Sequence, residues 1–220
     1  MGLILSKFKS LNFPCFGSRK PFITSESLIA IRLIVLALRS NIQVIANGWM
    51  FRPEVGLHQG VVQELVESVE SGDIRSVQNL LDAGWRLEAS QAIYTYLTRL
   101  VDPLIPAEIQ ALVLDENGDV PVEVVAADVL GLIRQELPGN HLQLIAMLLH
   151  LLDFVIKSSP ADELRGNTLP ISMLPIFFNI QNQHINEWRR IAAIFLEIIR
   201  QSTNYLDVTL YDEEEQGCDD

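Results

Sequence analysis

The 220-residue chain is poor in cysteine and lacks the short motifs that hold metals or nucleotides. Its two cysteines, Cys15 and Cys218, lie near opposite ends, so the sequence predicts neither a disulfide framework nor a zinc site. CxxC, HExxH and GxxxxGK patterns do not occur, so we expect no metal, no cofactor and no nucleotide bound by the chain itself. A serine or cysteine nucleophile at a recognisable elbow is also missing, so we expect no catalytic centre of its own.

Long apolar runs and an overall positive charge are missing too. The apolar run from Leu28 to Leu38 is interrupted by Arg32 and is too short to span a bilayer, so it predicts a buried helix. The net charge of −12 makes nucleic acid a poor partner. The charge is unevenly placed, because residues 1–25 carry no acid and residues 207–220 carry no base.

The first residues fit the N-myristoylation pattern, with Gly2 after the initiator and Ser6 four residues later. One acyl chain anchors a protein only marginally, so a second signal is needed. Cys15 is a palmitoylation candidate, and each basic residue gains about 1 kcal/mol near an anionic leaflet. These basic residues are Lys7, Lys9, Arg19 and Lys20. We therefore expect a cytoplasmic protein held at the inner leaflet of the plasma membrane or at an endomembrane. A disordered tail and a mitochondrial transit peptide are the alternatives.

Apolar residues recur at helical spacing through most of the chain, and the one alternating run is 206–211. The pattern predicts an all-α domain of about eight helices at residues 25–204, between a basic tail (1–24) and an acidic disordered tail (205–220). Ser25 or Ser27 is expected to cap the first helix, and Gly72 and Asp73 to separate two helices. The helices are expected at 26–41, 60–71, 74–82, 90–101, 107–113, 122–137, 141–158, 169–179 and 186–202.

Several segments resemble the signatures of Rho GTPase-activating (RhoGAP) domains. The stretch from Tyr96 to Pro106 reads YLTRLVDPLIP and is similar to the family's YLRELPEPLIP. Asn47-Gly-Trp-Met-Phe-Arg52 resembles the GIFR loop that carries the family's arginine finger. Residues 61–72, 137–155 and 167–174 resemble three further family segments in the same order, so the likeness extends over about residues 21–200. The resemblance implies a helical bundle that binds a Rho-family GTPase.

The same resemblance assigns candidate site residues. Arg52 takes the place of the arginine finger, although another register puts Gln59 there. The family's interface lysine, arginine and asparagine fall at Tyr94, Thr98 and Met173, and Arg99 follows the second of them directly. Neither tyrosine nor threonine replaces a cation, since even lysine and arginine are not interchangeable at such sites.

Three functional hypotheses follow. The first is a membrane-tethered RhoGAP-like regulator that binds the GTPase with weak or no stimulation of GTP hydrolysis, a pseudo-GAP. The second is an active GTPase activator that uses Arg52, since an arginine finger contributes about 10³–10⁵ to the rate. The third is a helical adaptor without GTPase binding, which uses another face such as the last helix. That helix carries an apolar stripe, which is either packed on the bundle or offered to a partner. Its residues are Trp188, Ile191, Ala192, Phe195, Ile198 and Ile199.

Overall fold

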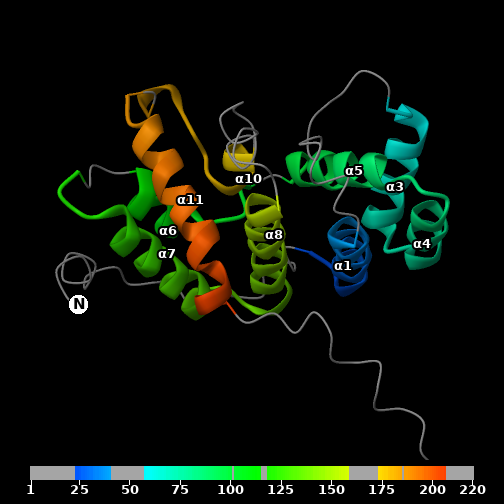
Figure 1. Cartoon of the computed structure of the whole chain (residues 1–220), viewed down its shortest axis with the longest axis horizontal. Helices are drawn as coiled ribbons and strands as arrows, with labels where there is room; N and C mark the ends of the chain where they lie inside the picture. Colours follow the sequence, from blue (N-terminus) through cyan, green and yellow to red (C-terminus); the bar gives the residue numbers. More distant parts are fainter. Residues whose placement is uncertain are drawn as a thin grey trace, which may run out of the picture.

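The computed structural model describes residues 23–40, 57–100, 102–114, 118–158, 173–184 and 186–206. These residues form nine α-helices and one 3-10 helix and contain no strand, so the predicted all-α fold is confirmed for them (Figure 1). The α-helices are α1 (Ser25–Arg39), α3 (Gln59–Ser71), α4 (Ile74–Asp82), α5 (Arg86–Thr98), α6 (Ala107–Leu114), α7 (Val122–Glu136), α8 (Gly139–Ser158), α10 (Leu174–Phe177) and α11 (Trp188–Tyr205), and the 3-10 helix is η2 (Asn182–His184).

Helix α8 lies between two groups of helices (Figure 1). On one side α1 packs against α3, α4, α5 and α8, and on the other side α11 packs against α6, α7 and α8. Phe177, Phe178 and Phe195 are fully buried and in ring contact, which joins α10 to α11. By length and composition α8 could cross a membrane, but 56% of its apolar window is buried inside the domain. We interpret it as a core helix.

The helix boundaries on the α1 side follow from local capping. Thr24, rather than Ser25 or Ser27, caps α1: its hydroxyl oxygen accepts a hydrogen bond from the Ser27 backbone N–H at 3.1 Å. Gly72 ends α3 in the left-handed conformation, with φ +71°. Asp73 then caps α4 and accepts a 3.1 Å bond from the Ser76 N–H, which confirms the predicted role of this pair.

The proline-containing segment after α5 is fixed by hydrogen bonds to distant elements. The backbone N–H groups of Leu104 and Ile105 donate to the carbonyls of Ile176 and Phe177, at 2.9 and 3.2 Å. On the other side the Leu104 carbonyl accepts a 2.6 Å bond from the Nε2–H of His141. Burial lowers the pKa of His141 and so favours the neutral ring, which still donates through this nitrogen. The segment is thus tied to both α10 and α8.

A buried glutamine completes this junction. Gln110 on α6 is 4% exposed, and its amide nitrogen donates to the Ile105 carbonyl at 2.5 Å. Its amide oxygen accepts a 2.8 Å bond from the Asn179 backbone N–H. Both ends of the buried Gln110 side chain are therefore satisfied by main-chain groups, as burial of polar groups requires.

Helices α5 and α10 differ most from the expected boundaries, and the ends of α1, α8 and α11 differ from them by two or three residues. Helix α5 begins at Arg86, four residues before the predicted start, because buried Glu88, Ala89 and Ser90 pack as part of it. Helix α10 is a single turn in which Pro175 occupies the first turn, where its missing N–H has no helical acceptor to lose. The predictions for residues 1–22 and 207–220, Gly2 and Cys15 included, lie outside the described residues. The predicted tail limits are too wide, because Ile23 and Leu206 are buried in the core and Tyr205 ends α11.

Candidate functional site

The sequence places three candidate interface residues at the end of α5. Tyr94 is half-buried and packs against the core, so much of its ring supports the fold. Thr98 is exposed, and its hydroxyl donates to the Thr95 carbonyl at 2.8 Å. Arg99 caps the helix immediately after it. Tyr94 and Thr98 therefore give this surface hydroxyl groups in place of positive charges.

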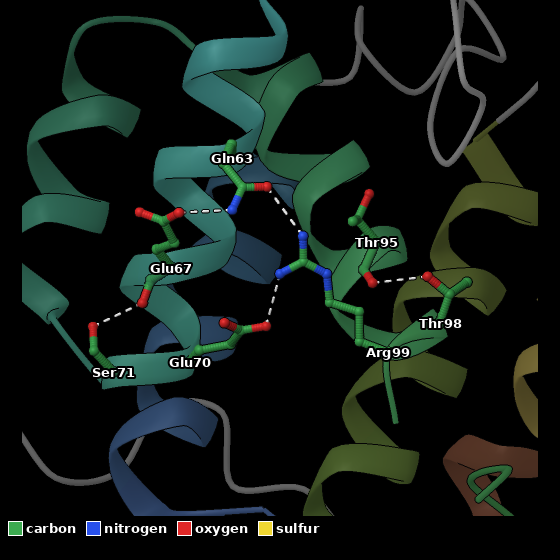
Figure 2. A network of polar contacts seen from close by, with 7 residues as sticks. All are labelled: Gln63, Glu67, Glu70, Ser71, Thr95, Thr98 and Arg99. Atoms are coloured by element: carbon green, nitrogen blue, oxygen red, sulfur yellow. Dashed lines mark hydrogen bonds and ion pairs between the residues drawn. The ribbon is translucent and has the colours of Figure 1, made fainter. Parts of the chain in front are cut away.

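The Arg99 side chain points towards α3 (Figure 2). Its Nη1 lies 2.9 Å from the Glu70 Oε1 atom, and its Nη2 donates to the Gln63 Oε1 atom at 3.0 Å. The amide nitrogen of Gln63 donates in turn to Glu67 at 2.7 Å. We call these four residues the Arg99 network. It connects the end of α5 to one exposed face of α3.

Arg52, the candidate arginine finger, lies outside the described residues. The structure does show how the chain is held at the start of α3, a few residues after it. The backbone N–H of His58 donates to the Glu88 carboxylate at 3.3 Å, and the His58 ring lies edge-on to Trp85, with 4.8 Å between ring centroids. Glu88 is 7% exposed, so this carboxylate anchors the start of α3 from inside the domain.

Met173 does not share the surface of the α5 residues. Its side chain is 0% exposed and belongs to the hydrophobic core beside α10. Methionine has no charge to hydrate and fills irregular space well, which suits it to this buried position. The structure therefore assigns Met173 to packing and does not bring it together with Thr98 and Arg99 on an accessible face.

The apolar stripe predicted on the last helix is mostly covered. Ile191, Phe195 and Ile198 are buried on the face of α11 that packs against α7 and α8. Trp188 is the exception, because it is 46% exposed at the first turn with the Arg189 guanidinium 5.9 Å from its ring centroid. The greater part of this stripe thus serves the bundle itself.

A family model of the RhoGAP domain matches residues 54–182, which is more than half of the chain. This chain belongs to the RhoGAP family. The match includes α3, α5, the proline segment and α8, and it begins two residues after Arg52. No significant match is found among curated proteins or among solved structures. Membership in this family implies a role in Rho GTPase regulation, with a Rho-family GTPase as the partner.

Sequence patterns did not identify Gln63, Glu70 or Glu88 as structural partners of the candidate site. Gln63 and Glu67 stand four residues apart on a helix, a spacing that allows a side-chain bond. The bonds from Arg99 span 29 and 36 residues, and the bond from His58 to Glu88 spans 30. Residues so far apart in the sequence cannot be paired from the local spacing of residue types.

Proposed function

We propose that this RhoGAP domain binds a Rho-family GTPase at a membrane surface, with weak or no stimulation of GTP hydrolysis. The observation that carries the proposal is the surface at the end of α5. Tyr94 and Thr98 supply no cation there, and the neighbouring Arg99 guanidinium is paired with Glu70. The start of the family match at residue 54, beyond Arg52, adds support, because the segment that resembles the finger loop precedes the matched region.

The physical basis is electrostatic. Phosphoryl transfer in a GTPase is accelerated by positioning and by positive charge placed where negative charge develops. The end of α5 contributes little to either while the Arg99 guanidinium is paired with a carboxylate, although it still offers shape and hydroxyl groups for binding. The bond from the His58 backbone N–H to buried Glu88 anchors the start of α3, so the domain keeps a defined α3–α5 face.

The test is single-turnover GTP hydrolysis by a panel of Rho-family GTPases, with and without the full chain. We expect binding to the GTP-loaded form and acceleration of less than about tenfold, far below the 10³–10⁵ of a working finger. Acceleration in that higher range that disappears in Arg52→Ala, but persists in the exposed α4 variant Arg75→Ala, would establish the active alternative instead. Absence of binding to every nucleotide state would leave the adaptor hypothesis.

Membrane tethering is a separate part of the proposal and rests on the sequence of the first residues. Gly2 is the acceptor of the myristoyl group, and Cys15 supplies the second acyl site. We expect Gly2→Ala to move the protein from the membrane fraction to the soluble fraction, and Cys15→Ser to do so partly. Unchanged fractionation of Gly2→Ala, together with no incorporation of a myristate analogue, would remove this part of the proposal.

A further inference from the structure

We propose that Glu70 and Gln63 hold Arg99 against α3 in the GTPase-free protein and release its guanidinium to a carboxylate of the bound GTPase. Glu70 and Gln63 would then be positioning residues that limit affinity. This inference deepens the proposed function and rests on it, because it specifies how Arg99 exchanges its internal carboxylate for one on the GTPase and so adds to binding.

The geometry of the pair allows the Arg99 guanidinium to exchange its present partners for others. The guanidinium contacts one oxygen of Glu70 at 2.9 Å, and its second nitrogen goes to the neutral amide oxygen of Gln63 at 3.0 Å. A guanidinium binds best when both nitrogens face the two oxygens of one carboxylate. The Arg99 network does not provide that fork-to-fork arrangement, so a carboxylate on a partner can offer a better one.

The solvent exposure of Arg99 and Glu70 determines how much free energy the exchange of partners costs. The side chains of Arg99 and Glu70 are 42% and 43% exposed, so water screens their attraction. Ion pairs of this kind contribute about 1 kcal/mol at most, which corresponds to about fivefold in an equilibrium constant. A partner therefore has to outcompete a weak contact, and the internal pair reduces GTPase affinity by no more than about fivefold.

The backbone under Arg99 stays in place during such an exchange. The Arg99 backbone N–H donates to the Tyr96 carbonyl at 3.1 Å, and Tyr96 and Leu97 are buried in the core. On the opposite side Gln63 is oriented by its 2.7 Å bond to Glu67. Release thus requires rotation of one exposed side chain and no movement of a helix, and the rotating side chain belongs to the residue that follows Thr98 at the end of α5 (Figure 2).

The test measures the dissociation constant of the full chain for Rho-family GTPases loaded with a non-hydrolysable GTP analogue. Glu70→Ala removes the internal carboxylate, and we expect about three- to fivefold tighter binding. Glu64→Ala is the matched control, because Glu64 is an exposed glutamate of the same helix outside the Arg99 network. It should change affinity by less than about twofold, a range typical of one screened surface charge. Adding Arg99→Ala to Glu70→Ala should cancel the gain.

Nuclear magnetic resonance of the Arg99 side chain supplies a readout that does not depend on the GTPase. We expect restricted rotation of the guanidinium in the wild type and free rotation in Glu70→Ala. Free rotation in the wild type would overturn the inference. Detectable GTPase binding by the wild type, with no gain in Glu70→Ala, would overturn it while leaving the proposed function intact. If neither protein binds any GTPase, the proposed function fails and this inference fails with it.

Discussion

Replacing Gly72 with alanine tests the packing of α1 against α3 most directly. Gly72 has φ +71°, and a left-handed conformation costs a residue with a Cβ about 1–2 kcal/mol. The added Cβ would also lie 2.3 Å from the Cβ of Glu26 and 3.4 Å from its backbone, so the two helix ends must separate. Forced overpacking of this kind costs about 1–3 kcal/mol. We expect a loss of about 2–5 kcal/mol from a domain whose total stability is on the order of 5–15 kcal/mol.

Chemical denaturation of the full chain measures this loss as a lower midpoint, and thermal unfolding shifts by about 2–4 °C per kcal/mol. Gly84→Ala is the matched control, since Gly84 has φ +95° but no atom lies within 4 Å of the position that its Cβ would take. It therefore reports backbone strain without the steric contact. Equal losses in the two variants would refute the close approach of Gly72 to Glu26.

The double variant Glu26→Gly/Gly72→Ala separates the contact further. Removing the Cβ of Glu26 eliminates the 2.3 Å overlap and leaves the backbone at 3.4 Å. A double-mutant cycle should then give a coupling energy of about 1–3 kcal/mol, as expected for residues that share one packing site. Strict additivity of the two single changes would argue against direct contact.

Three further predictions concern the rest of the bundle. Gly131→Ala within α7 should raise the free energy of unfolding by about 0.5–1 kcal/mol, measured by denaturation, because no atom lies within 4 Å of the added methyl group. A lower free energy of unfolding would show that this position has no room for a methyl group. Gln110→Leu should cost about 1–3 kcal/mol, since the buried Ile105 carbonyl and the partly buried Asn179 N–H lose their partner, whereas a neutral result would mean that water replaces the amide. Burial lowers the pKa of His150 below 6.5, so stability should be full above pH 6.5 and fall as pH drops through the lowered value. His150→Gln should weaken that slope, and an unchanged slope would exclude His150 as its source.

Local sequence was sufficient for most of the helices. The limits of α4 agree with the prediction, and those of α3 and α7 differ by one residue, because apolar spacing and the Gly72–Asp73 boundary act within a few residues. The start of α5 was placed too late because its first turn has no side-chain cap. Its packing depends instead on buried Glu88, which contacts His58 thirty residues earlier.

The residues of the candidate site show the same difference between what local sequence predicts and what tertiary contacts decide. The sequence by itself determined the helical fold and the family. Both can be recognised from the spacing of apolar residues and from the order of short motifs, which require no knowledge of tertiary contacts. The tertiary structure decided what the site residues do. Burial assigns Met173 to the core, and Arg99 turns to Glu70 and Gln63, since contacts across 29 and 36 residues arise only when α5 packs on α3.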